Sequence, residues 1–151
     1  MMEEIGTVAA LLGQGGLHEA LRFLNARTSH RFTGVYRFDG EMLRSVALFD
    51  RWDPETRCGE DVPIDQAYCG IVQKIGMGLE VPDGRGDGRY PWLAESQVQS
   101  YCGVLIVGPE GEPIGALCHY DLQRCQTATG EMPLMAAVAP LIAQWLVAAQ
   151  A

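Results

Sequence analysis

The chain has 151 residues, of which 48% are hydrophobic and 20% are charged, and its formal net charge is -8. This length and composition predict one globular domain with a hydrophobic core of its own. The acidic balance argues against nucleic acid and anionic membranes as partners, because both attract clustered Lys and Arg. We find no pattern of a signal peptide or a membrane-spanning segment, so we expect a cytoplasmic protein.

The cysteines are odd in number and form no C-x-x-C pair. They are Cys58, Cys69, Cys102, Cys118 and Cys125. Three of them lie in apolar segments, where a free cysteine behaves as a small hydrophobic side chain. This pattern predicts reduced thiols and no disulfide framework.

The first third of the chain predicts two helices followed by a hairpin. Apolar residues recur with helical spacing in residues 1–13 and again in residues 17–28, with glycines between the two segments. Residues 32–38 and 41–49 then flank Asp39-Gly40, a dipeptide that favours a two-residue hairpin turn. We therefore expect two antiparallel strands here.

The middle of the chain is less regular. Residues 50–63 predict a polar loop, and Asp65 is a suitable N-cap for a helix over 66–75. A short strand is expected at 79–82. Residues 83–97 combine glycines and charges with bulky side chains, and a loop of this length in a compact domain is usually functional or mobile.

Residues 101–107 and 114–121 predict a second hairpin around the turn Gly108-Pro109-Glu110-Gly111. The first strand places Ser100, Cys102, Val104 and Ile106 on one face, and Tyr101, Gly103, Leu105 and Val107 on the other. Strands that are apolar on both faces are usually covered on both sides. We therefore expect this hairpin in the middle of the sheet.

The last helix is predicted over residues 131–151, with Pro133 in its first turn and a kink at Pro140. It is apolar nearly all round, which indicates either deep burial or a second partner. One interpretation is a homodimer formed through this helix, and the other is burial within the domain. The whole order of elements favours an α+β architecture, with helices on one face of a sheet and a helix-and-loop layer on the other.

Four segments resemble GAF domains. They are Y-C-G-I-V at 68–72, V-P-D at 81–83, D-G-R-Y at 87–90 and the hairpin over 100–121. The resemblance implies a single domain over 1–151, with a core of about 17–146, around a central antiparallel sheet of five to six strands. It places terminal helices on one face and a ligand pocket on the other. It also implies a sensory or regulatory input, often in a dimer, whose output lies in a downstream signalling protein.

The resemblance implies a non-catalytic small-molecule-binding site in bacterial-type signal transduction, and the sequence names neither its ligand nor a cofactor. The candidates on segments that border the GAF pocket are Trp52, Cys69, Asp83, Arg89, Tyr90, Trp92, His119 and Tyr120. A metal site is not expected, because the histidines are not at ligand spacing.

Two other functions stay open. Some GAF proteins reduce free methionine sulfoxide with cysteines in the segment that opens the pocket helix and in the loop before the central hairpin. Cys69 matches the first position, whereas residues 83–100 contain no cysteine. A thiol-dependent reductase centred on Cys69, with Cys102 or Cys118, is therefore an alternative. A regulator that acts by protein contact with an empty pocket is the other.

Further ligand classes fit less well. Cyclic-nucleotide-binding GAF domains share a sequence signature after the last strand, and the segment 120–131 lacks it. Cys118-His119 has the dipeptide of bilin-linked photoreceptors, but on a predicted strand. The loop D-G-R-G-D-G-R-Y does not open a helix as a phosphate-binding loop does, and its aspartates repel phosphate. We interpret that loop as a flexible lid.

Overall fold

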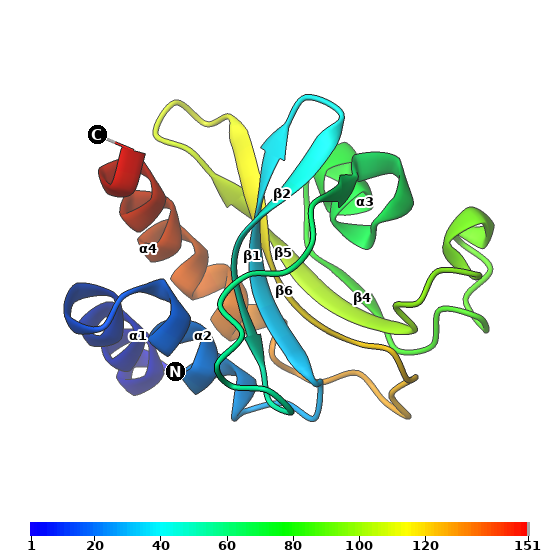
Figure 1. Cartoon of the computed structure of the whole chain (residues 1–151), viewed down its shortest axis with the longest axis horizontal. Helices are drawn as coiled ribbons and strands as arrows, with labels where there is room; N and C mark the ends of the chain where they lie inside the picture. The colour runs from blue at the N-terminus through cyan, green and yellow to red at the C-terminus, as the bar shows by residue number, and fades with distance from the viewer. Residues whose placement is uncertain (151) are drawn as a thin grey trace.

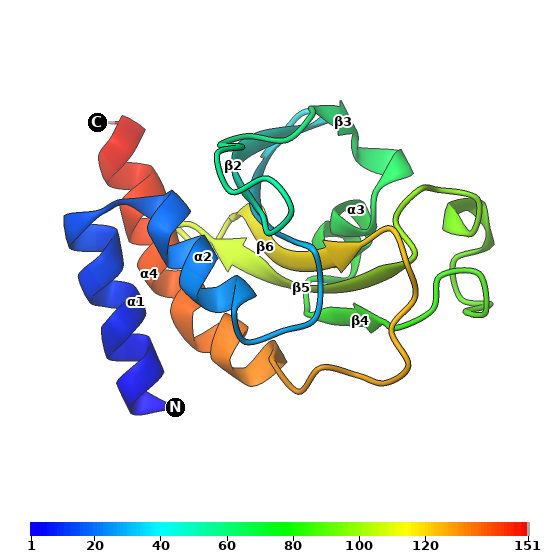
Figure 2. The same ribbon diagram turned by 60° about the horizontal axis from the view of Figure 1, so that its bottom comes forward.

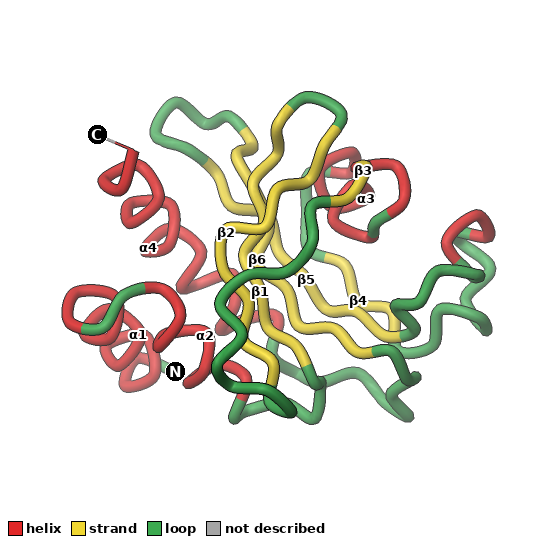
Figure 3. The backbone as a smooth tube through the Cα atoms, in the orientation of Figure 1, coloured by secondary structure: helices red, strands yellow, loops and turns green. Residues whose placement is uncertain are grey.

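The computed structural model describes residues 1–150 and contains one curled antiparallel sheet within them, in the strand order β3-β2-β1-β6-β5-β4 (Figure 1). The strands are β1 (Phe32–Asp39), β2 (Met42–Asp50), β3 (Val62–Pro63), β4 (Leu79–Val81), β5 (Ser100–Val107) and β6 (Pro113–Asp121). Figure 3 shows how the loops connect them around the curled sheet. The predicted α+β class with a central antiparallel sheet is confirmed.

Both predicted hairpins form. Gly40 turns the first one with a φ of 61°, a conformation that suits glycine. The second hairpin supplies two inner strands, because β6 pairs with β1 on one side and with β5 on the other. Gly115 lies at a close approach of two strand backbones, since a Cβ there would overlap the carbonyl oxygen of Tyr36. The expectation of a central hairpin is confirmed.

Three helices lie on one side of the sheet, and the second and third of them pack directly on it while the first packs on the other two (Figure 2). They are α1 (Met2–Gln14), α2 (Leu17–Asn25) and α4 (Met132–Gln150). Their buried side chains, such as Leu21 and Ile142, pack on Val35, Val104 and Leu117 from the sheet. Burial of one such aliphatic side chain stabilises the fold by about 1.5–3 kcal/mol, so this apolar layer contributes much of the folding free energy.

The opposite face carries a thinner layer made of α3 (Tyr68–Ile75) and two short helical turns, η1 (Ile64–Gln66) and η2 (Pro91–Leu93). A second cluster lies under this layer. It contains the buried residues Tyr36, Leu43, Tyr68, Cys69, Ile71, Val72, Leu79, Val81, Leu93, Tyr101, Ala116 and Cys118. The two layers therefore enclose two different cores, one aliphatic and one rich in tyrosine and cysteine.

Two local predictions on this face need correction. Asp65 does not cap the pocket helix, because it lies inside the turn η1, and α3 follows Ala67 without a side-chain cap. The supposed loop 50–63 ends in the strand β3, which pairs with β2 at Met42 and Leu43. A strand of two residues is too short to show an alternating pattern in the sequence.

Helix α4 has no charged side chain and contains Pro140. Residues Met132–Ala149 have a mean hydropathy of 1.7, so by length and composition this helix could cross a membrane. Long helices in the core of a globular domain have the same length and composition. In this helix, Leu134, Met135, Val138 and Ile142 are buried against the sheet. Its apolar character is thus accounted for on its inner face, while its outer face remains exposed.

Candidate functional site

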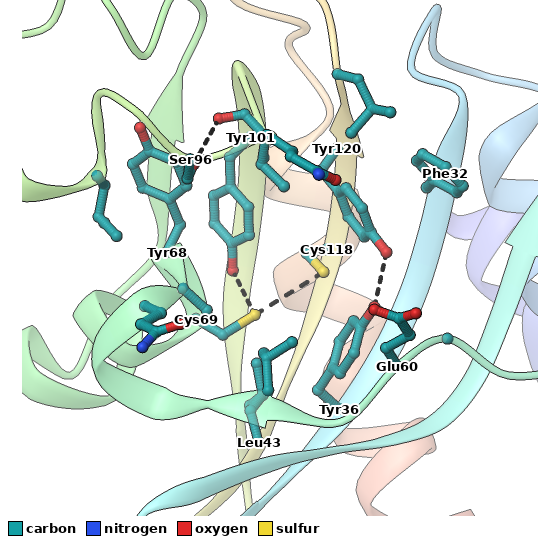
Figure 4. Close-up of a pocket in the computed structure, with 18 of the residues that line it drawn as sticks. Phe32, Tyr36, Leu43, Glu60, Tyr68, Cys69, Ser96, Tyr101, Cys118 and Tyr120 are labelled. Atoms are coloured by element: carbon teal, nitrogen blue, oxygen red, sulfur yellow. Dashed lines mark hydrogen bonds between the residues drawn. The ribbon is translucent and has the colours of Figure 1, made fainter.

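A cavity of about 920 Å³ lies between the sheet and the layer that contains α3 (Figure 4). Strands β1, β2, β5 and β6 form its floor, α3 forms one wall, and segments 59–66 and 92–98 form its rim. The lining includes Phe32, Tyr36, Glu60, Asp65, Tyr68, Cys69, Trp92, Glu95, Tyr101, Cys118 and Tyr120. Ligand pockets in proteins are typically about 300–1,000 Å³, so the cavity is large enough for a metabolite.

Two tyrosine hydroxyls meet inside the cavity. The oxygens of Tyr36 and Tyr120 are 2.7 Å apart, and the ring of Tyr120 stacks on Phe32 with 4.9 Å between ring centroids. Burial raises the pKa of both tyrosines, so both hydroxyls stay neutral. One hydroxyl donates to the other, which leaves the second hydrogen of the pair available to a ligand.

A second polar group lies deeper in the cavity, at Cys69, Tyr101 and Cys118. The Sγ of Cys69 is 3.1 Å from the Tyr101 hydroxyl and 4.0 Å from the Sγ of Cys118. Figure 4 shows the three side chains pointing toward one another. The ring of Tyr101 lies over Gly103, where a Cβ would overlap it. The absence of a side chain at Gly103 therefore positions Tyr101 against the thiol.

The two thiols differ in acidity. The hydrogen bonds that the Cys69 sulfur shares with the thiol of Cys118 and the hydroxyl of Tyr101 lower the pKa of Cys69. Burial raises the pKa of Cys118, and its hydrogen bond to Cys69 adds to that effect. Cys69 is also the second residue of α3, where the helix dipole favours a negative charge. Cys69 is therefore the thiol of this pair that ionises first.

The rim of the cavity is acidic. Glu60, Asp65 and Glu95 belong to the lining, and no Lys, Arg or His occurs among the lining residues of the described chain. An anionic ligand would meet like charges at the opening and no counter-ion inside. The cavity thus favours neutral or positively charged molecules.

The structure brings three of the eight predicted site residues to the cavity: Cys69, Trp92 and Tyr120. Trp52 lies elsewhere, 68% exposed, under the guanidinium of Arg31 at 4.2 Å. The other loop residues make local contacts. Asp83 accepts a hydrogen bond from the backbone N–H of Gly86, Arg89 pairs with Asp87 at 2.6 Å, and Tyr90 packs edge-on against Trp92.

His119 lies on the opposite face of the sheet from the cavity, so its expected place at the pocket is corrected. Its neighbours Cys118 and Tyr120 point into the cavity, and side chains alternate along a strand. The Nδ1 of His119 is 2.6 Å from the hydroxyl of Thr33, its ring stacks on His30, and its Nε2 has no hydrogen-bond partner among the described residues. Burial lowers the pKa of His119 to about 3.

Sequence reasoning missed several residues of the cavity, notably Phe32, Tyr36, Tyr68 and Tyr101. The alternation along β6 was a usable signal, because a pocket at Tyr120 implies that Cys118 shares its face and that His119 does not. The same alternation along the first predicted hairpin would have identified Tyr36 as a candidate cavity residue.

No protein-family model and no curated protein matches this sequence. Solved structures do match. A GAF domain from an Acinetobacter phosphoenolpyruvate-protein phosphotransferase superposes with a TM-score of 0.74 at 11% identity, covering 99% of this chain and 93% of that one. A putative GAF sensor protein from Burkholderia vietnamiensis gives a TM-score of 0.72 at 13% identity, covering 95% and 90%. The chain has the GAF fold.

The GAF fold is shared by enzymes. A free methionine-R-sulfoxide reductase from Neisseria meningitidis, in complex with its substrate, superposes with a TM-score of 0.75 at 15% identity. The match covers 99% of this chain and 89% of that one. Sensor domains and reductases thus share this scaffold, so the fold does not decide between them and the side chains of the cavity carry the functional argument.

Proposed function

We propose that this GAF-fold chain is a non-catalytic small-molecule-binding module with a sensory or regulatory role. The observation that carries the proposal is the cavity of about 920 Å³, whose floor is built from tyrosine and cysteine side chains of three sheet strands. A binding site of this kind needs an apolar body and a few placed polar groups. The Tyr36–Tyr120 pair and the Cys69–Tyr101–Cys118 group supply those polar groups.

The chemistry of the lining narrows the ligand class. Aromatic faces at Phe32, Tyr120 and Trp92 suit a planar or cationic group, and the carboxylates at the rim attract a positive charge. We therefore propose a neutral or cationic ligand with an aromatic or apolar body and at least one hydrogen-bond acceptor. Nucleotides and other polyanions are disfavoured because the lining offers them no basic side chain.

The first experiment compares the native and denatured masses of the purified protein, followed by thermal-shift screening of neutral, amine and carboxylate metabolites. We expect a retained molecule or a stabilising amine or neutral compound. Its affinity should fall several-fold in Tyr120→Phe and stay unchanged in Tyr90→Phe, because only Tyr120 of these two lines the cavity. A protein that carries no ligand and responds to no compound would contradict the proposal.

A thiol-dependent reductase is the second candidate, and the contact between Cys69 and Cys118 in the cavity favours it. The rim segment 92–98 contributes Trp92, Glu95 and Ser96 but no cysteine. Turnover of free methionine sulfoxide with a thioredoxin system tests this function. Turnover by the wild type that is lost in Cys69→Ser would establish the reductase and replace the sensor proposal.

We also propose a homodimer through the outer face of α4, which relays the ligand state to a downstream signalling protein. Val147 is 43% exposed there, Trp145 and Leu141 are half-buried, and the helix carries no charge. Light scattering should give a dimer for the wild type and for Glu110→Ala, which lies in the β5–β6 turn. Val147→Glu should give a monomer, and a monomeric wild type would contradict this arrangement.

A further inference from the structure

Two of the three fully buried cysteines contact each other, and the third does not. Cys69 and Cys118 have 2% and 1% exposure and their sulfurs are 4.0 Å apart. Cys102 is equally buried, but it lies on the helix-covered face with the Sδ of Met135 at 3.7 Å. The chain therefore contains a dithiol pair and a buried single thiol that serves as an internal control.

The pair is placed so that a small reactant reaches it. Both cysteines belong to the lining of the cavity, whereas Cys102 does not. Cys69 comes from the first turn of α3 and Cys118 from β6, with 49 positions between them in the chain. A disulfide requires the sulfurs to approach to about 2.05 Å. The sulfurs, now 4.0 Å apart, must therefore come about 2 Å closer for the bond to form.

We propose that Cys69 and Cys118 form a reversible disulfide at the floor of the cavity, with a small hydroperoxide as the oxidant. The thiolate of Cys69 attacks the terminal peroxide oxygen, the O–O bond breaks, and the OH group passes to sulfur, so that Cys69 becomes a sulfenic acid. The alkoxide that leaves, or the hydroxide from hydrogen peroxide, takes up the proton that the Cys69 thiol released and becomes an alcohol or water. Cys118 then attacks the sulfur of that sulfenic acid and displaces water. Two thiols are oxidised by two electrons, and one peroxide is reduced.

The asymmetry of the pair fits these roles. The nucleophile must be a thiolate, and the hydrogen bonds that Cys69 shares with Cys118 and Tyr101 lower the pKa of Cys69. The raised pKa of Cys118 keeps that thiol protonated until the sulfenic acid forms beside it. A thiol reductant such as dithiothreitol reverses the reaction by thiol–disulfide exchange.

The disulfide would change the cavity itself. It would tie α3 to β6 and withdraw the sulfur of Cys69 from the hydroxyl of Tyr101, now 3.1 Å away. The floor of the cavity therefore has two chemical states. This inference concerns the thiols alone and holds whether or not the ligand proposal does.

The test treats the reduced full chain with a small excess of hydrogen peroxide, alkylates free thiols under denaturing conditions and maps the peptides by mass. We expect a linked peptide that joins Cys69 and Cys118, its loss on treatment with dithiothreitol, and full alkylation of Cys102. Cys69→Ser and Cys118→Ser should abolish the link, and Cys102→Ala should retain it. The oxidised wild type should also melt at a higher temperature, because a disulfide restricts the unfolded chain.

Full alkylation of Cys69 and Cys118 after peroxide treatment that oxidises the exposed Cys58 would overturn the inference. A link from either residue to Cys102 or Cys125 would overturn it as well. The readout needs no ligand, so a failure here leaves the small-molecule proposal intact. If the Cys69–Cys118 disulfide forms but the protein binds no metabolite, this inference holds and the small-molecule proposal fails.

Discussion

The free energy of unfolding of this protein should decrease as the pH is lowered from neutral to mildly acidic values, because the imidazole of His119 is buried. The folded protein keeps His119 neutral, since burial lowers its pKa from 6.5 to about 3. The unfolded chain binds a proton at this side chain below pH 6.5. The folded state therefore loses stability relative to the unfolded state as the pH falls from 6.5 toward 3, and the contribution is fully present above 6.5.

The magnitude follows from the proton difference. One proton bound only by the unfolded state changes the free energy of unfolding by about 1.4 kcal/mol per pH unit. A fall from pH 6.5 to roughly pH 5 thus costs about 2 kcal/mol, a large share of a total stability of about 5–15 kcal/mol. Burial also lowers the pKa of His30, so that residue acts in the same direction.

Urea unfolding at several pH values between roughly pH 7 and roughly pH 5 measures this effect. His119→Gln keeps a polar side chain near Thr33 but cannot titrate in this range. The variant should be less stable at neutral pH and should show a smaller loss on acidification than the wild type. Against the effect of burial, the hydrogen bonds from Arg31 lower the pKa of Asp50, so this carboxylate remains ionised throughout the window. Equal pH dependence in the wild type and the variant would refute the reasoning.

Three further predictions concern stability. Gly103→Ala should cost about 1–3 kcal/mol because the new methyl group overlaps the ring of Tyr101, whereas Gly6→Ala in α1, with open space around it, should be neutral or stabilising; thermal melts compare the two. Tyr36→Phe should cost about 1 kcal/mol because it removes the partner of the Tyr120 hydroxyl, and Tyr90→Phe, which has no such partner, should cost less in the same urea titration. Arg31→Ala should cost about 1–3 kcal/mol because it leaves the buried carboxylate of Asp50, now 2.9 Å away, without its ion-pair partner. Arg44→Ala breaks only exposed ion pairs and should cost under about 1 kcal/mol. A similar loss of stability in both variants would contradict this ranking.

The periodic elements could be predicted from the sequence, and the short ones could not. Asp39-Gly40 located the first hairpin, and the run over 100–121 located the two inner strands. β3 and η1 escaped because they span only two and three residues, too few for any period to show. The position of Asp65 was misassigned for the same reason, since a helical turn before the helix took up that residue.

The site was predicted less well than the fold, and the reason is geometric. The resemblance to GAF domains indicates which segments border the pocket, but it does not indicate which side chains of those segments turn inward. Arg89 and Tyr90 lie in the right loop and contact their own neighbours, because the charge of Asp87 satisfies Arg89 locally. Local pairing of this kind depends on loop conformation, which residue type and spacing do not specify.

Because side chains alternate along β6, neighbouring residues of this strand have different roles, one set facing the cavity and the other the core. Cys118 and Tyr120 face the cavity, whereas Leu117 and His119 face the helix-covered core. In a saturation mutagenesis scan of this strand, substitutions at Leu117 and His119 should lower protein abundance. Substitutions at Cys118 and Tyr120 should instead alter the response to a ligand. Under the proposed binding function, substitutions at every second residue would alter ligand preference while the intervening residues keep the chain folded.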